Sequence, residues 1–324
     1  MIGFDIGGTK CAVSIGEFSD GKIKIEDKKI IQTNHNLPPL AVIDKLTELA
    51  KSMTDKPDIV GISCGSPLDS KQGIILSPPN LPGWDRVEIC KYLREKYGLR
   101  AYLQNDANAC ALAEWLFGAG KGCKNMIFLT FGSGLGAGLI LNGRLYTGTN
   151  DMAGEAGHIR LAENGPVGYG KRGSFEGFCS GNGIAELGRI YAIEKLQEGK
   201  TVSYCGSYGE LKNVTAKLIA EKAKEGFADA AEVYAESGRR LGQGLSVLID
   251  ILNPERIVIG SVFERSGGLL EGEMNKIIEK EALSFSRKKC EIVPAALGDS
   301  IGDYAAFCVA EYMSKNTERT GGYE

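Results

Sequence analysis

One carboxylate, Asp106, lies in a sequence context that suits proton transfer. It follows a short apolar strand pattern at residues 100–104 and precedes a strong helix pattern (ANACALAEWLFGAG) that ends at Gly118. At the carboxyl end of a strand, a carboxylate projects into the crevice where α/β folds bind ligands, and there it can take a proton from a hydroxyl. Asp is also a favoured N-cap, so Asp106 could instead cap the helix that begins at Ala107. The two roles do not exclude each other.

Two glycine-rich segments could bind the phosphates of a nucleotide. In residues 5–10 (DIGGTK), the carboxylate offers a ligand to hydrated Mg²⁺, the glycines expose N–H groups, and the last two residues add a hydroxyl and a positive charge. Residues 132–136 (GSGLG) could hold the phosphates from the other side. Phosphoryl transfer needs mainly positioning and charge stabilisation, which two facing backbone cradles supply. The candidate ATP site comprises Asp5, Gly7, Gly8, Thr9, Lys10, Thr130, Gly132, Ser133, Gly134, Gly136 and Gly260.

Glu155 and His158 form a candidate clamp for sugar hydroxyls. They are three residues apart in AGEAGH (153–158), and on a helical turn this spacing places both on one face. A lone histidine is more often structural than a ligand contact. The chain has only two histidines, however, and the glycine-rich context favours a functional role. The pair therefore points to a polyhydroxylated substrate, whereas a carboxylate substrate would call for Arg.

Two other motifs suggest different enzymes but lack the required context. Residues 61–65 (GISCG) match the nucleophile elbow of serine hydrolases, but the turn GSPLD follows where that fold needs a helix. Residues 165–171 (GPVGYGK) nearly match a Walker A loop, but Arg172 stands where Ser or Thr should bind magnesium, and no apolar strand leads in. We therefore set both enzyme classes aside.

Two segments look like copies of one unit: an apolar strand, a glycine-rich turn and a second apolar strand. They are residues 3–15 (GFDIGGTKCAVSI) and 128–140 (FLTFGSGLGAGLI). Glycine allows positive φ and lets a ligand approach the backbone closely. The repeat indicates two related domains that face each other across a cleft. Two ordinary hairpins are the alternative, although a simple hairpin needs only two turn residues.

The remaining elements alternate between strand and helix, which predicts an α/β fold with helix-covered sheets. A chain of 324 residues suits about two domains, and we place the boundary near residues 118–122. The polar residues 316–324 are expected to fray. The predicted elements are helices 40–53, 107–118, 227–252, 269–285 and 301–315 and strands 58–64, 100–104 and 256–260.

Composition excludes several classes of protein. The chain is 43% hydrophobic with a net charge of −3, whereas a nucleic-acid surface would usually be basic. No apolar run approaches the roughly 18 residues of a membrane span, and the first residues read as a strand rather than a signal peptide. The nine cysteines are scattered without a CxxC pair, so we expect small buried side chains in a reducing, cytoplasmic compartment.

In this order the motifs resemble the ROK family of bacterial sugar kinases and sugar-responsive repressors, within the actin/hexokinase superfamily. The resemblance covers nearly the whole chain. It rests on DIGGTK (5–10), SPPNLPGW (77–84), NDAN (105–108), FGSGLGAGLILNGRLYTGTNDMAGEAGH (131–158) and GDSIGD (298–303).

The resemblance implies a two-domain actin/hexokinase-like (ribonuclease H-like) α/β fold in which ATP and sugar meet in the interdomain cleft. Residues 1–118 with about 300–324 would form the smaller domain and residues 119–299 the larger. Asp106 would be the general base as a primary hydroxyl of a hexose, such as glucose or an N-acetylhexosamine, attacks the γ-phosphate of MgATP. A homodimer is the family expectation. The implied sugar contacts are Asn80, Asn105, Asp106, Glu155, His158 and Glu176.

The chain departs from the family pattern in one segment. Family members usually carry CxCGxxGCxE after the GH motif, and its three cysteines join the histidine on a structural zinc. The corresponding residues here are Val167, Tyr169 and Ser174, none of which is a thiolate. We therefore expect no structural zinc. His158 would be left to face the sugar, and packing by Val167, Tyr169 and Phe175 would hold the loop.

Two other functions stay open beside the kinase. A non-catalytic sugar sensor would keep the clamp and lose phosphoryl transfer, although both glycine loops and Asp106 are intact. An enzyme of the superfamily acting on a non-sugar, such as an acyl-phosphate-forming kinase, is the other. Family repressors carry an N-terminal helix-turn-helix arm. Because the first phosphate strand begins at residue 2, we do not expect a repressor.

Overall fold

The computed structural model describes residues 1–19, 22–55 and 57–319, and it contains two five-stranded sheets with the same topology. In each sheet, three antiparallel strands are followed by two parallel ones, in the orders β3-β2-β1-β4-β7 and β10-β9-β8-β13-β14. The first contains β1 (Ile2–Ile6), β2 (Lys10–Ser19), β3 (Lys22–Gln32), β4 (Ile59–Cys64) and β7 (Arg100–Asn105). The second contains β8 (Met126–Leu129), β9 (Ala137–Leu141), β10 (Arg144–Tyr146), β13 (Arg256–Ile259) and β14 (Glu291–Pro294). The repeat seen in the sequence is confirmed as the central hairpin of each sheet.

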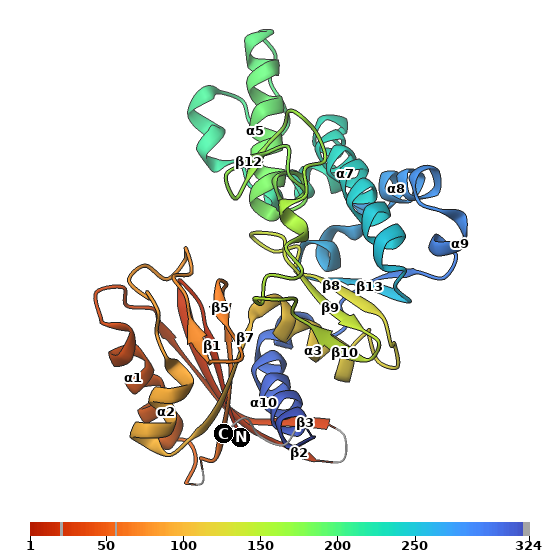
Figure 1. Ribbon diagram of the computed structural model, residues 1–324. Helices are drawn as coiled ribbons and strands as arrows, with labels where there is room; N and C mark the ends of the chain where they lie inside the picture. Colours follow the sequence, from red (N-terminus) through yellow and green to blue (C-terminus); the bar gives the residue numbers. More distant parts are fainter. Residues whose placement is uncertain (20–21, 56, 320–324) are drawn as a thin grey trace.

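Two helices lie between the sheets (Figure 1). α10 (Ile301–Arg319) packs on β1, β4 and β7, and α3 (Asp106–Phe117) packs on α10, β8 and β9. Glycines make this layer thin, since a Cβ at Gly61 of β4 would overlap the carbonyl of Ala306. The start of α3 is thereby placed between the two sheets.

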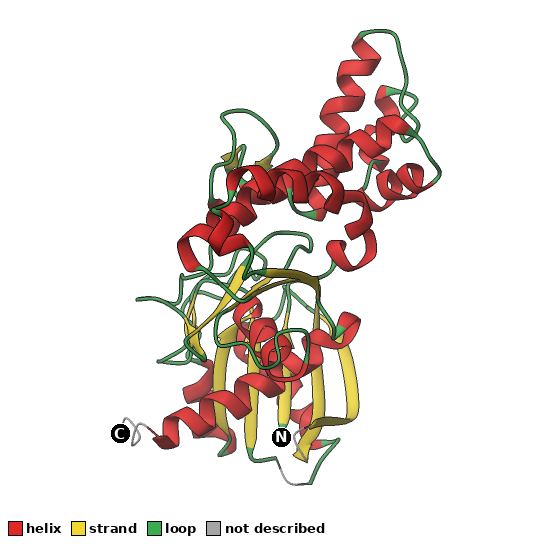
Figure 2. Ribbon diagram, turned by 90° about the vertical axis from the view of Figure 1, so that its right-hand side faces the viewer, coloured by secondary structure: helices red, strands yellow, loops and turns green. Residues whose placement is uncertain are grey.

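Helices also cover the two outer faces, which confirms the predicted α/β class. α1 (Pro39–Lys51) and α2 (Ile89–Tyr97) bury their apolar sides against the first sheet, and α7 (Ala228–Leu252) and α8 (Val262–Glu281) against the second. Figure 2 shows the strands gathered in the lower half beneath a largely helical region. The remaining elements are β5 (Leu68–Asp69), β6 (Ile74–Ile75), β11 (Val167–Gly168), β12 (Lys171–Arg172), η1 (Ala156–His158), η2 (Tyr208–Asn213), η3 (Gly298–Ser300), α4 (Phe175–Phe178), α5 (Gly181–Gln197), α6 (Ala216–Lys224) and α9 (Ser284–Arg287).

Two predicted helix boundaries are wrong. The helix expected at 269–285 begins at Val262, because Ser261 and Glu264 form a capping box, and it is kinked at Ser266. α10 continues through Arg319, so the fraying predicted from residue 316 does not apply to 316–319. Residues 320–324 lie outside the described part of the chain.

The rejected motifs and the cysteines behave as predicted. Ser63 is buried inside β4 with no helix after it, and residues 165–171 run through the small β11–β12 hairpin. All nine cysteines are free, and six are buried. No helix in the described ranges is both long and apolar enough to span a membrane.

A buried carboxylate on α3, that of Glu114, holds both chain connections between the sheets. Its Oε2 accepts the N–H of Ala119 at 2.7 Å, where the chain leaves α3 for the second sheet. Its Oε1 accepts the N–H groups of Ala296 (3.0 Å) and Leu297 (2.9 Å), where the chain returns. Charged acceptors make stronger hydrogen bonds than neutral ones, so Glu114 fixes the two connections relative to α3.

Substituting Glu114→Gln tests this anchor. The amide nitrogen of Gln would face a backbone N–H, leaving a buried donor unsatisfied. We expect the free energy of unfolding to fall by about 1–3 kcal/mol, measured from urea denaturation midpoints. Glu48→Gln, on the exposed side of α1, is the control and should change stability by less than about 0.5 kcal/mol. An unaltered midpoint in Glu114→Gln would contradict the assignment.

Candidate active site

A cavity of about 470 Å³ lies beyond the carboxyl ends of β4, β7 and β8, between the two sheets. This is the position at which α/β folds commonly bind ligands. The structure therefore brings together residues from distant parts of the chain. The predicted site residues that line it are Asn80, Asn105, Asp106, Thr130, Gly132, Ser133, Gly134, Gly136, Glu155 and Glu176.

The start of α3 presents Asp106 to this cavity, but Asp106 is not the N-cap. The N-cap is Asn105, whose Oδ1 accepts the N–H of Asn108 at 2.7 Å. The capping interpretation of Asp106 is therefore wrong, because the helix begins one residue earlier than predicted. Asp106 Oδ1 accepts the N–H of Ala107 at 2.8 Å. Asn105, predicted as a sugar contact, can offer its amide nitrogen while its oxygen caps the helix.

Asp106 and Asp5 share an acidic environment. Asp106 reaches solvent inside the cavity but lies deep in the protein, and this burial raises its pKa, while the Ala107 N–H partly offsets the effect. Burial, followed by the charges of Asp106 and Asp303, raises the pKa of Asp5 to about 6, and Lys28 and Lys10 act in the opposite direction. A carboxylate with a raised pKa is a stronger proton acceptor, so Asp106 is suited to general-base chemistry.

The second glycine loop is held from within by two side chains. Thr130 Oγ1 accepts the N–H of Gly136 at 2.9 Å, and Glu176 Oε2 accepts the N–H of Leu135 at 2.9 Å. Both were predicted as ligand contacts. Thr130 closes the hairpin and Glu176 uses one oxygen to hold the loop, and both residues also line the cavity.

The first glycine loop does not line this cavity. The residues concerned are Asp5, Gly7, Gly8, Thr9 and Lys10. Gly8 packs directly behind Asn80, because a Cβ there would overlap the Asn80 backbone oxygen. The sequence predicted that the two loops hold the phosphates from two sides of one cavity. In the structure they do not line one common cavity, because Asn80 lies between them.

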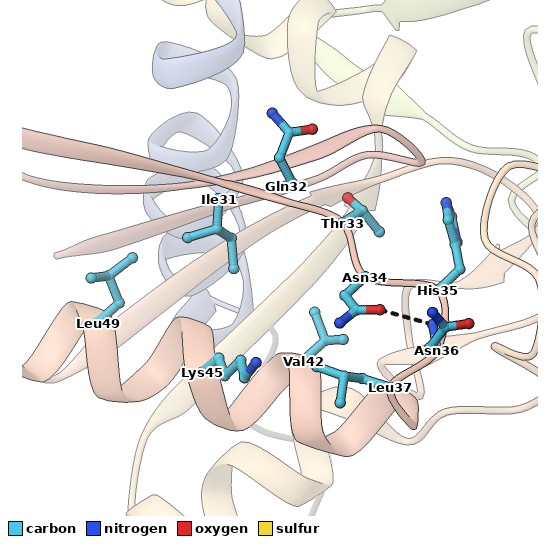
Figure 3. A pocket seen from close by; sticks show the side chains of 10 residues that line it. All are labelled: Ile31, Gln32, Thr33, Asn34, His35, Asn36, Leu37, Val42, Lys45 and Leu49. Carbon is cyan, nitrogen blue, oxygen red and sulfur yellow. Dashed lines mark hydrogen bonds between the residues drawn. The ribbon is translucent and has the colours of Figure 1, made fainter.

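One residue that supports the first loop was not found from the sequence. Thr33, after β3, donates its hydroxyl to Gly7 O at 2.7 Å and its N–H to Thr9 O at 2.9 Å. A Thr after a long charged strand carries no local signal of this role. Thr33 also borders a separate cavity of about 630 Å³ between β3 and α1 (Figure 3). No predicted site residue lines that cavity, so we do not assign the chemistry there.

The strained turn before η1 orients Glu155. Gly154 has φ +95°, its carbonyl accepts the N–H of Ala137 at 2.8 Å, and a Cβ would overlap Ala137 O. Glu155 is the N-cap of the 3₁₀ turn η1 and His158 is its last residue. Residues three apart eclipse in such a turn, which favours the predicted shared side. Burial and then the charges of Asp106 and Glu176 raise the pKa of Glu155, and His158 lowers it.

Besides the residues of the first glycine loop, two predicted site residues, His158 and Gly260, lie outside the cavity lining. The His158 ring stands edge-on to Tyr169, with centroids 6.3 Å apart. Gly260 donates its N–H to Leu129 O at 3.0 Å. Gly260 therefore lies behind the second loop, because β13 pairs with β8 at this point.

The loop without thiolates is held differently from the prediction. Val167 and Tyr169 are 53% and 72% exposed, so they do not pack it, whereas Phe175 is fully buried as expected. Ser174 caps α4 by accepting the N–H of Gly177 at 3.1 Å. The Gly173 carbonyl accepts two backbone N–H groups, so hydrogen bonds replace the expected apolar packing. Within residues 1–19, 22–55 and 57–319, no group of three or more His, Cys, Asp or Glu is arranged to hold a metal.

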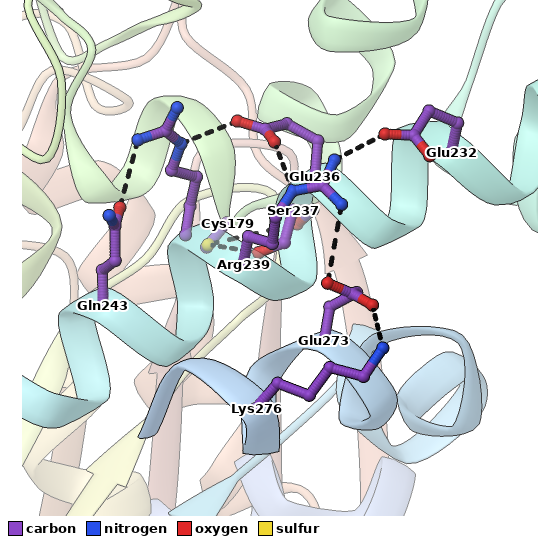
Figure 4. A network of polar contacts seen from close by, with 9 residues as sticks. Cys179, Glu232, Glu236, Ser237, Arg239, Gln243, Glu273 and Lys276 are labelled. Atoms are coloured by element: carbon purple, nitrogen blue, oxygen red, sulfur yellow. Dashed lines mark hydrogen bonds and ion pairs between the residues drawn. The ribbon is translucent and has the colours of Figure 1, made fainter. Parts of the chain in front are cut away.

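α4, which carries Glu176, is fastened to α7 by a polar network (Figure 4). Ser237 Oγ donates to Phe178 O at 2.8 Å, and Cys179 Sγ lies 3.4 Å from Ser237 O. Beside them, Arg239 forms ion pairs with three glutamates, of which Glu273 comes from α8. The network thus joins the helical region to the wall of the cavity.

Comparison with known proteins assigns the family. The profile described as ROK family matches residues 1–312. A glucokinase of Halalkalibacterium halodurans is 33% identical over 310 residues, which cover 93% of this chain and 92% of that protein. The chain belongs to the ROK family.

Other ROK proteins similar to this chain include both a kinase and a repressor. The crystal structure of a ROK family glucokinase from Streptomyces griseus, in complex with glucose and AMPPNP, has a TM-score of 0.75 and 26% identity, covering 96% of this chain and 99% of that one. A xylose repressor of Caldicellulosiruptor bescii is 29% identical over 90% of this chain and 73% of its own length. The predicted family and fold class are confirmed.

The charge of Asp5 predicts a pH-dependent change in stability for Asp5→Asn. Because folding raises the pKa of Asp5 from 3.8 to about 6, the ionised carboxylate destabilises the folded state. This cost is absent below about pH 4, grows between pH 4 and 6, and is constant above. We expect the free energy of unfolding of Asp5→Asn, relative to that of the parent, to increase by up to roughly 3 kcal/mol across that window. Urea denaturation midpoints at each pH measure this difference. The exposed Asp58→Asn is the control, and a pH-independent difference for Asp5→Asn would refute this prediction.

Proposed function

We propose that this ROK protein is an ATP-dependent hexose kinase with Asp106 as its general base. The observation that carries the proposal is that Asp106 shares one cavity with the second glycine loop, residues 132–136, and with Glu155. Similarity to glucokinases, one of them with glucose and AMPPNP bound, supports the same reaction. Glucose or a related aldohexose or N-acetylhexosamine is the proposed acceptor.

In the proposed reaction the hexose occupies the cavity, with hydrogen bonds to Asn80, Asn105, Glu155 and Glu176. Asp106 accepts the proton as the primary hydroxyl oxygen attacks the γ-phosphorus of ATP. The bond from that phosphorus to the β–γ bridging oxygen breaks, and ADP leaves. The N–H groups of Ser133 and Gly134 in the second loop stabilise the charge on the phosphates.

Mg²⁺ would enter with ATP, and Asp5 is the proposed protein group that faces it. The carboxylate of Asp5 fits this role because Asp106 and Asp303 repel its charge, which a cation would offset. When bound, the ion neutralises charge on the phosphate oxygens. His158 is proposed to act through Glu155, whose pKa it lowers, rather than as a zinc ligand.

We further propose that the two sheets belong to separate domains that close on the ligands. The proposed boundaries are residues 1–118 with about 300–324 and residues 119–299. Closure would bring the first glycine loop, together with Asn80 of the same domain, closer to the second loop and exclude water from the reaction. The connections held by Glu114 lie at the proposed hinge.

A non-catalytic sugar sensor is the second candidate, because the chain is also similar to xylose repressors. A coupled assay that monitors ADP release with each of a panel of hexoses separates the kinase from the sensor. A kinase releases ADP in proportion to sugar consumed, whereas a sensor binds sugar without turnover.

Asp106→Asn tests the proposed base. Without a proton acceptor, kcat should fall by about 10²–10⁴-fold or more, while the sugar Kd measured by calorimetry changes little, because the amide keeps the shape of the side chain. Asp58→Asn, at the amino end of β4 and far from the cavity, is the matched control and should retain full turnover. Near-normal kcat in Asp106→Asn would remove Asp106 from this role.

A further inference from the structure

A second cavity adjoins the proposed sugar site. It has a volume of about 600 Å³ and lies between the β11–β12 hairpin and one face of α5. Ser133 and Glu176 line both cavities, so their side chains form the wall between the two. Each volume is within the range of about 300–1,000 Å³ usual for ligand sites. The two cavities are therefore neighbours, and a ligand that spans both would pass Glu176.

The hairpin presents an aromatic ring to this second cavity. Tyr169 is 72% exposed and has φ +43°, a conformation that side-chain-bearing residues rarely adopt. Such strain is often found at binding sites, where the surrounding structure holds it. The ring is an apolar platform with a hydroxyl at its edge, which suits the C–H face and the hydroxyls of a sugar ring.

The charges around the cavity are balanced. Arg189 pairs with Glu186 at 2.9 Å and donates to the carbonyls of Leu211 (3.1 Å) and Val214 (3.0 Å), so its donors are used within the protein. Arg172 is accompanied by Glu176 on the same lining. A neutral, hydroxyl-rich ligand fits this balance better than an anion, which would call for an excess of positive charge.

Most of the cavity lies on the side of α5 that is turned away from Gly132 O and Val262, and Ser133 of the second glycine loop lies at its edge. Gly181 donates to Gly132 O at 2.7 Å and faces Val262, the first residue of α8. Gly183, two residues later and 200° around the helix, packs instead on Gly177 of α4. The second cavity opens on this latter side, beside the hairpin, and it adjoins the proposed sugar site at Glu176.

We propose that the second cavity is a subsite for a second sugar ring, so that the acceptor is a disaccharide. This rests on the proposed kinase function. The terminal hexose would present its primary hydroxyl to Asp106, and the other ring would lie against Tyr169. The step is unchanged: the hydroxyl oxygen bonds to the γ-phosphorus, its proton passes to Asp106, and ADP leaves.

The test compares glucose with cellobiose and maltose as acceptors, by ADP release and by calorimetry without ATP. We expect a disaccharide to be phosphorylated at least as efficiently as glucose. Tyr169→Ala should lower the ratio of disaccharide to glucose kcat/KM by about tenfold, and Tyr169→Phe should largely retain it. Tyr208→Ala, an exposed tyrosine on neither cavity, is the control. Tyr169→Ala introduces no new backbone strain, because alanine also has a Cβ and would keep the same positive φ as tyrosine.

The outcomes separate this inference from the kinase proposal. If glucose is phosphorylated but neither disaccharide binds, the subsite is wrong and the kinase stands. If Tyr169→Ala raises the KM for ATP rather than for sugar, the cavity serves the nucleotide, and the inference is overturned. If a disaccharide binds in a Tyr169-dependent way but no sugar causes ADP release, the subsite stands and the kinase proposal fails.

Discussion

The geometry of the cleft depends on the hydrogen bonds that the buried carboxylate of Glu114 accepts. It binds both chain connections between the sheets and lies on α3, the helix that packs against both. Because Asp106 is the first residue of that helix, its position follows from how these connections are held. A Cβ at Gly138 of β9 would lie 2.5 Å from Ala107 O, so glycine is needed for β9 to approach the start of α3.

The two glycine hairpins share a topology but differ in how they are prepared for a ligand. The second is fixed by hydrogen bonds from Thr130 and Glu176 and lines the cavity. The first is supported by Thr33 but lies behind Asn80. This asymmetry places the preorganised backbone donors on one side of Asp106 and leaves the other side to be completed by a domain movement.

The segment at residues 167–174 is held by hydrogen bonds within the protein. Ser174 caps α4 where a thiolate would be expected, and backbone hydrogen bonds to Gly173 hold the return of the chain. The side chains of Val167 and Tyr169 are thereby released from the interior and face solvent. In this chain the same loop borders a second cavity beside Glu176, so its altered sequence bears directly on what the site can accept.

The sequence by itself determined the paired hairpins, the α/β class and the candidacy of Asp106, because these depend on short-range patterns: strand alternation, glycine turns and a carboxylate between a strand and a helix. It also rejected the residue 61–65 and 165–171 motifs from their local context. Only the tertiary structure decided that Asn105 caps α3, that Glu176 holds Leu135, that Tyr169 is exposed and that Glu114 joins both connections. The roles of Glu176, Tyr169 and Glu114 depend on contacts between residues far apart in the chain. The cap of α3 depends on which of two neighbours, Asn105 or Asp106, accepts one hydrogen bond. Neither kind of contact leaves a periodic signal in the sequence.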